Sequence, residues 1–378
     1  MEARRKSLHR GTLTMFGTIV GAGVFALPAL FKSTGILAGS LIYWVLALVV
    51  LAMHLLYADI ALRRDPLSHL KFPGHVAVIL GPWAGILALI VHSFALIGVC
   101  FAYLLLGGEF LASLSGFFGG PASVLLWQIL FWISGAFTVF FGLKTVARVE
   151  SWLSWCLAAL LLLSIALFIP RVDVSLFAGA AWGRVFAPFG IILFALSAYP
   201  IVPAVAEICG RNRARTMRAV VVGSLGAALL MWLFGVLGFA AVGSALTSNP
   251  ADVARVFPPS FFWLLPATGF LAVATSFLTL MDDLRGVFLA EFHVSEHIAW
   301  ILALSAPMAL LFLTERNFLA TAEFIGSSFT AIIGMLISFM AIKIESQKSK
   351  SLKVKSRILP FICAGLFFLA FIWRILSA

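Results

Sequence analysis

Charged side chains are scarce in this sequence. Asp, Glu, Lys and Arg make up only 11% of its 378 residues, whereas 62% are hydrophobic. A water-soluble globular chain carries about 25% charged residues, so the composition excludes one. No polar stretch between the apolar runs is long enough for a separate soluble domain. We therefore expect an all-α integral membrane protein with a single transmembrane domain over residues 1–378.

Clusters of reactive side chains are also missing. The four cysteines lack the spacing of metal or redox motifs and are expected to be small buried residues: Cys100, Cys156, Cys209 and Cys363. The histidines are scattered, so the sequence lacks the His/Asp or Ser/His group that a membrane-embedded acyltransferase needs. Hydrolase and kinase motifs are absent as well. The sequence therefore predicts no enzyme activity, no bound metal and no cofactor.

Long apolar runs are abundant instead. A helix needs roughly 20 apolar residues to cross the hydrocarbon core of a bilayer. Eleven such runs lie between charge clusters or Pro/Gly-rich breaks: 11–31, 36–61, 80–106, 122–143, 151–170, 185–206, 217–243, 261–284, 297–313, 318–342 and 358–376. The basic start MEARRKSLHR could open a signal peptide, but the ten spans that follow favour a first membrane span.

The basic residues of the loops predict the orientation. With a cytoplasmic N-terminus, all but six of the 26 Lys and Arg residues fall in inside segments, the exceptions being Lys32, Arg171, Arg184, Arg255, Arg316 and Arg374. The C-terminus is then outside. The net charge of +11 is explained by this topology and by a loop, KIESQKSKSLKVKSR, that faces anionic lipid. Lipid is therefore the expected partner, and nucleic acid is not.

Two spans are predicted to be broken helices. The first carries Gly17, Gly21, Gly23 and Pro28, and the sixth carries Pro200 and Pro203. Glycine and proline both disfavour a helix interior. Matched breaks five spans apart indicate an inverted-repeat secondary transporter with its site at the bilayer midplane. The repeats would cover 11–170 and 185–342, with 358–376 as an extra helix.

The breaks suit a zwitterionic ligand. Free amide groups at the start of a half-helix favour a carboxylate, and free carbonyls at the end of one favour a cation. We expect Gly21, Ala22 and Gly23 to hold an α-carboxylate, and the carbonyls around Ser197, Ala198 and Tyr199 to hold an ammonium group. The alternative is that the glycines form a packing seam and the prolines are simple kinks.

Several motifs resemble the hydroxy/aromatic amino-acid permease family over nearly the whole chain. They are GTIVGAGVFALP in the first span, ATSFL followed by LMDDL in the eighth, and NFLATAEFIGS at the start of the tenth. The resemblance implies eleven spans, a LeuT-type five-plus-five inverted repeat and the bacterial cytoplasmic membrane. The sequence departs from the family at Tyr199-Pro200, where an aromatic-His-Gly sequence is common. The spacing from Pro203 to Glu207 instead resembles the sodium-coupled neutral amino-acid transporters.

The resemblance also implies a place for the coupling ion, H⁺ or Na⁺. In LeuT-type transporters a cation lies between the first and eighth spans, which corresponds to the carbonyls of Gly17 and Val20 and the hydroxyls of Thr275 and Ser276. Oxygen ligands suit Na⁺. The alternative is that both hydroxyls bond a carbonyl one turn back.

The resembling permeases are mostly proton-coupled, so acidic groups near the pathway are candidates too: Glu207, Asp282, Asp283 and Glu323. For Glu207 and Glu323 the alternative is a helix cap, and for the two aspartates an ion pair with the inner basic loops. His54 is expected to be a packing histidine.

We expect His92, Phe194, Ser197 and Tyr199 to form the pocket wall. Because neither break contains an unpaired charge, a neutral amino acid is the favoured substrate, and the family favours an aromatic one. The sequence therefore predicts a symporter that works by alternating access. The alternative is a transporter-like amino-acid sensor without net transport.

Overall fold

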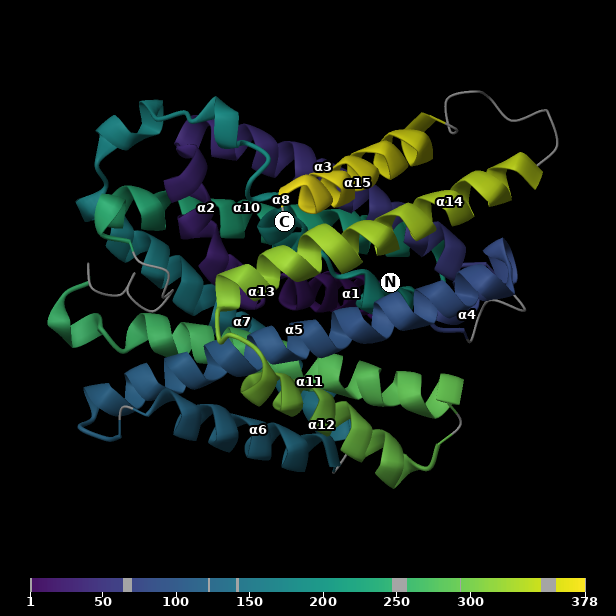
Figure 1. Cartoon of the computed structure of the whole chain (residues 1–378), viewed down its shortest axis with the longest axis horizontal. Coiled ribbons are helices and arrows are strands. Elements are labelled where there is room, and N and C mark those ends of the chain that lie inside the picture. The colour runs from purple at the N-terminus through teal and green to yellow at the C-terminus, as the bar shows by residue number, and fades with distance from the viewer. Residues whose placement is uncertain are drawn as a thin grey trace.

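The structure is a computed structural model that describes residues 2–63, 70–121, 123–140, 143–246, 257–292, 294–347 and 358–377. Within these ranges the chain is helical and contains no β-strand (Figure 1). Most helices lie side by side along one direction, as expected for a bundle that crosses a bilayer.

The helices follow the predicted spans closely. The first five spans correspond to α1 (Glu2–Ile19) with η1 (Ala22–Ala26) and α2 (Leu27–Thr34), α3 (Ile36–Ala61), α5 (Pro82–Phe117), α6 (Val124–Phe140) and α7 (Leu143–Phe168). The next five correspond to α8 (Phe189–Leu196) with η5 (Tyr199–Ile201) and α9 (Val202–Ile208), α10 (Arg213–Val242), α11 (Leu264–Phe292), α12 (Glu296–Leu313), and α13 (Phe318–Phe324) with η9 (Ile325–Thr330) and α14 (Ala331–Gln347). The last span is α15 (Ile358–Ser377), and a short helix, α4 (Phe72–Leu80), precedes α5.

Not every predicted span is long and apolar enough to cross a bilayer by itself. In the described ranges eight helices are, and the bent pair Lys6–Ile19 and Ala22–Thr34 makes a ninth. The fourth and fifth spans appear as shorter apolar helices, Val124–Phe140 and Trp155–Arg171. The count of eleven therefore stays a prediction.

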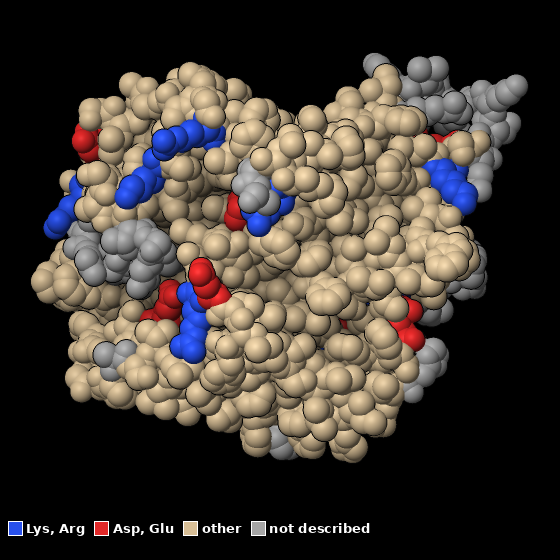
Figure 2. Space-filling model, viewed as in Figure 1, with Lys and Arg blue, Asp and Glu red and all other residues tan. Residues whose placement is uncertain are grey.

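The outer faces of the bundle are apolar. Large hydrophobic side chains such as Trp83, Phe137 and Phe361 are more than half exposed, and the face in Figure 2 is dominated by uncharged residues. An apolar surface of this extent needs cover by lipid or protein. The protein is therefore an integral membrane protein.

Both predicted breaks are present. In the first span α1 ends at Ile19, and the Gly21 N–H donates to Ile19 O at 2.8 Å rather than to Gly17 O one turn back. The chain bends by 42° before it continues. In the sixth span α8 ends at Leu196, Ser197 is extended and Ala198 is not helical. The glycine and proline signals therefore placed both breaks correctly.

Basic side chains make contacts at both ends of the bundle. At one end Arg213 pairs with Asp59 at 3.1 Å, and Arg211 donates to Ala61 O at 3.3 Å. These contacts join the end of α3 to the loop between α9 and α10. We call this the inner end, because the sequence predicts these basic loops to be cytoplasmic. At the outer end Lys32 Nζ donates to Leu246 O at 2.5 Å.

Candidate substrate and ion site

The break in the first span lies against α5 and α11. A Cβ atom placed on Gly21 would lie 2.6 Å from the Tyr103 hydroxyl and 3.1 Å from Ser276 Oγ. The Tyr103 phenol also interacts with the Ala22 amide and with Ser276, although Ser276 Oγ has no hydrogen bond of normal geometry in the described structure. Gly21 and Ala22 thus face polar groups, as a ligand site requires.

Tyr103 was missed by the sequence reasoning. It lies eleven residues after His92 on α5, which is about three helical turns, so both side chains share one face of the helix. That spacing from a candidate pocket residue was the available signal.

Gly23 has a different neighbour from Gly21. A Cβ atom there would collide with the backbone of Ala195 in α8, at the Cα atom. The broken first span and the broken sixth span therefore touch backbone to backbone at this glycine. This contact supports the packing interpretation for Gly23, while its carboxylate-binding role stays a prediction.

The break in the sixth span is stabilised by a histidine from α3. The Ala198 N–H, released where α8 ends, donates to His54 Nε2 at 3.1 Å, and His54 Nδ1 lies 3.4 Å from Ser224 Oγ. Because Nε2 accepts, the ring hydrogen is on Nδ1 and points to Ser224. His54 is fully buried. The predicted packing histidine therefore caps the break.

Replacing His54 tests this cap. We expect His54→Leu to cost about 1–3 kcal/mol of folding free energy, because the Ala198 N–H is left buried without an acceptor. A cost of that size corresponds to a roughly 5- to 150-fold change in the folding equilibrium constant. His54→Gln should retain much of the uptake, because its amide oxygen can accept the bond. Uptake and thermal unfolding in detergent measure both effects, with the exposed His297→Leu as control. Wild-type behaviour of His54→Leu would contradict the cap.

Aromatic rings and a free hydroxyl lie beside the breaks. The rings of Tyr103, Phe194 and Phe318 form a row, with centroids 6.4 Å and 6.2 Å apart. Ser197 Oγ is buried and, within the described structure, has no hydrogen-bond partner. Such an atom needs a partner that the chain does not supply.

The hydroxyls predicted to hold a cation behave differently from each other. Thr275 donates to Leu271 O at 3.0 Å and to Ala272 O at 3.2 Å within its own helix, as the alternative interpretation predicted. Ser276 Oγ faces the break in the first span, as the distance from Gly21 shows. Gly17, in the last turn of α1, and Val20, directly after that helix, are both buried. An oxygen-lined ion site between the two spans stays a prediction.

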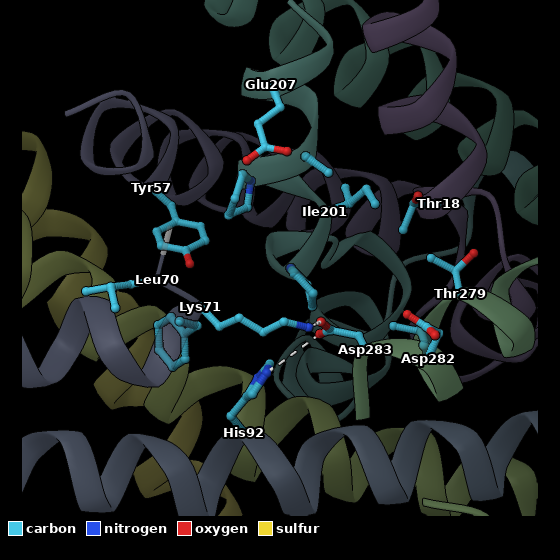
Figure 3. Close-up of a pocket in the computed structure, with 15 residues that line it drawn as sticks. Thr18, Tyr57, Leu70, Lys71, His92, Ile201, Glu207, Thr279, Asp282 and Asp283 are labelled. Atoms are coloured by element: carbon cyan, nitrogen blue, oxygen red, sulfur yellow. Dashed lines mark hydrogen bonds and ion pairs between the residues drawn. The ribbon is translucent and has the colours of Figure 1, made fainter. Parts of the chain in front are cut away.

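A cavity of about 380 Å³ opens on the inner side of both breaks (Figure 3). Its lining includes Thr18 before the first break, Pro203 and Glu207 after the second, and Lys71, Asp282 and Asp283. The side chains of Lys71 and Glu207 are 37% and 62% exposed, so the cavity reaches solvent at the inner end.

A connected set of polar groups crosses the wall of this cavity. Lys71 Nζ lies 2.5 Å from Asp283 Oδ1, and His92 Nε2 lies 3.7 Å from Asp283 Oδ2. His92 Nδ1 is hydrogen-bonded to the Tyr199 hydroxyl at 2.6 Å. The ring of Phe72 packs against both His92 and Tyr199. Three predicted site residues are thus brought together, and Lys71, which the sequence marked only as a basic loop residue, joins them.

The other acidic candidates lie in three separate places. Asp282 pairs with Arg285 at 3.5 Å, and Glu207 pairs with Arg211 at 3.2 Å near the inner surface. Glu323 lies away from both, where its carboxylate accepts the Gly190 N–H at 3.2 Å and the Ile191 N–H at 2.8 Å at the start of α8. Glu323 therefore caps one half of the sixth span from the tenth. Within the described ranges, no group of three or more His, Cys, Asp or Glu residues could hold a metal.

Comparison with known proteins agrees with this geometry. The sequence profile of the tryptophan/tyrosine permease family matches residues 4–375. No curated protein matches the chain. Among solved structures, MhsT in complex with L-phenylalanine is similar, with a TM-score of 0.72 and 19% identity over 96% of this chain and 97% of that one.

Two structures of Mhp1 are similar as well. Mhp1, a nucleobase-cation-symport-1 family transporter, was solved in a closed conformation with bromovinylhydantoin bound, and it matches with a TM-score of 0.69 and 14% identity over 96% of this chain and 91% of that one. Its inward-facing conformation matches with a TM-score of 0.69 and 12% identity over 98% and 91%. These similarities confirm the LeuT-type fold.

Proposed function

This chain belongs to the tryptophan/tyrosine permease family, and we propose that it carries a neutral aromatic amino acid across the membrane together with a cation. Family and fold make it a secondary transporter of amino acids and not an enzyme. The proposal adds the substrate class, the binding groups and the coupling.

One observation carries the proposal: each break exposes a buried hydroxyl, that of Ser197 without a hydrogen-bond partner in the described structure and that of Ser276 in contact with the Tyr103 phenol only. Ser276 Oγ lies beside Gly21 in the first break, and Ser197 Oγ belongs to the second. The charged ends of an amino acid could supply these atoms with partners. The row of Tyr103, Phe194 and Phe318 next to them suits an aromatic side chain, because rings pack well edge to face.

The structure supports alternating access with the inner side open. The cavity lies on the inner side of both breaks. On the outer side α8 is held to α13 and η9 by Glu323, and the backbones of Gly190 and Gly326 are in direct contact. A substrate bound between the breaks would therefore leave toward the inner end. We place the N-terminus in the cytoplasm and the protein in a bacterial inner membrane, which makes this direction uptake.

Transport by purified protein tests the proposal. In proteoliposomes we expect labelled L-tryptophan, L-tyrosine or L-phenylalanine to be accumulated, and to be exchanged when the same amino acid is present inside. Accumulation should require an imposed proton or sodium gradient. Alanine and lysine serve as competitors, and we expect only the aromatic amino acids to compete strongly. Binding without accumulation or exchange would instead indicate a sensor, and preference for lysine would contradict the neutral site.

A further inference from the structure

Asp283 is a partly buried carboxylate in the wall of the inner cavity. It lies on α11 with a side chain that is 21% exposed, and the Lys71 ammonium is bound to it directly. A carboxylate in such a place is stable only with a positive partner or with a bound proton. Lys71 is therefore the positive partner that balances the Asp283 carboxylate in this conformation.

The other charged groups near Asp283 are engaged elsewhere. Arg285, the nearest arginine on the same helix, faces Asp282 and Glu296 at 3.5 Å each. Within the described structure, Lys71 is thus the one Lys or Arg that pairs with Asp283. Asp282 is a second negative group beside it, which makes an unpaired Asp283 carboxylate less favourable still.

Other titratable groups face the same cavity wall. Tyr57 and His75 are hydrogen-bonded to each other at 3.1 Å, so they satisfy one another. Glu207 lies across the cavity and pairs with Arg211. The ion-pair contacts of Asp283 in the described structure are those with Lys71 and His92.

Asp283 is connected to the break in the sixth span. His92 bridges them, since Nε2 faces Asp283 and Nδ1 is bound to Tyr199, the first residue of η5. His92 and Asp283 come from α5 and α11, which pack extensively against each other, whereas Tyr199 belongs to the broken span. The broken span is therefore in contact, through His92, with the surroundings of the carboxylate.

Lys71 reaches Asp283 along a groove that a glycine leaves open. A Cβ atom on Gly286 would lie 2.5 Å from Lys71 Nζ. Lys71 itself precedes α4, and its side chain extends across the cavity in Figure 3. The position of the Lys71 ammonium beside Asp283 therefore requires the space of the open cavity. It also requires a small residue at position 286.

We propose that Asp283 is the proton-binding group of the transport cycle and that the Lys71 ammonium displaces its proton when the inner cavity opens. Resting on the proposed function, this inference names the coupling ion as H⁺. With the cavity closed, the Asp283 carboxyl keeps its O–H bond and is neutral. With the cavity open, Lys71 binds the carboxylate, and the proton passes from Oδ to a water molecule in the cavity while both bonding electrons stay on oxygen. Lys71 keeps its own protons, so one H⁺ is released inside.

The test separates coupling from exchange in proteoliposomes without sodium. A pH gradient, alkaline inside, should drive wild-type accumulation of labelled L-tryptophan, L-tyrosine or L-phenylalanine, with proton entry reported by a trapped pH dye. We expect Asp283→Asn to lose accumulation and proton entry by about tenfold or more, because its side chain has no proton to release. Exchange of internal for external amino acid should persist, because it needs no net proton movement.

Two further variants act on the displacing ammonium. Lys71→Met removes it, and Gly286→Leu pushes it from Asp283 without changing any charge. Both should lose accumulation and keep exchange. Asp59→Asn is the matched control, because Asp59 also pairs with basic residues at the inner end but does not line the cavity. It should accumulate like the wild type.

The outcomes are distinct. Accumulation by Asp283→Asn at the wild-type level under the pH gradient would overturn the inference. In parallel proteoliposomes with an imposed sodium gradient, wild-type accumulation that follows sodium and ignores the pH gradient would also overturn it, although the proposed symport would then stand. Absence of both accumulation and exchange in the wild type would mean that the proposed function itself fails.

Discussion

Gly23→Ala is expected to abolish transport even though it adds only one methyl group. That methyl would collide with the Cα atom of Ala195, which is backbone and cannot rotate away. The two broken spans would have to separate, and overpacking of this kind costs about 1–3 kcal/mol or more. Uptake in proteoliposomes, with membrane insertion checked on the same samples, measures the effect.

Gly21→Ala provides a comparison at the same break. Its methyl would meet the end of a side chain, the Tyr103 hydroxyl at 2.6 Å. We therefore expect a loss of uptake that Tyr103→Phe partly reverses, because removing the hydroxyl makes room. The same second change should not rescue Gly23→Ala. Gly116→Ala is the control, since nothing lies within 4 Å of a Cβ atom there. Normal uptake by Gly23→Ala would show that the spans do not need this close contact.

Glu323→Leu is expected to reduce uptake by about tenfold or more. Two amide groups at the start of α8, those of Gly190 and Ile191, would lose their acceptor. Each buried amide without a partner costs about 1–3 kcal/mol, and tenfold corresponds to about 1.4 kcal/mol. The contact between α8 and α13 closes the outer side in the proposed cycle, so its loss should affect turnover as well as stability.

Variants at Glu323 are expected to lose uptake to different degrees. Glu323→Gln keeps one oxygen that accepts an amide and should be affected less than Glu323→Leu. Glu315→Leu changes a nearby exposed residue and should transport normally. Initial uptake rates and unfolding temperatures in detergent provide both measurements. Equal uptake by Glu323→Leu and the wild type would remove Glu323 from the closing contact.

The sequence predicted the breaks well because their signals are local. Gly21 and Gly23 in one span and Pro200 and Pro203 in the other disfavour a continuous helix whatever surrounds them. The chain indeed leaves the helix at Ile19 and at Leu196.

The partners of the breaks could not be predicted in the same way. His54 lies 144 residues from Ala198, and Lys71 lies 212 residues from Asp283. No periodicity or motif joins residues so far apart; only the packing of the bundle does. Tyr103 was missed as well, although its helical spacing from His92 is a local signal that places both on one face of α5.

The His54 cap makes the two halves of the protein unequal. The junction in the sixth span is fastened by an imidazole from a neighbouring helix, which fixes its main chain in one geometry. The junction in the first span instead borders the hydroxyls of Tyr103 and Ser276, which can reorient toward a bound solute. A bound solute would then contact one rigid junction, in the sixth span, and one more adaptable junction, in the first span. The rigid junction of the sixth span would then determine which solute shapes fit. The conformational change of transport would begin at the adaptable junction of the first span.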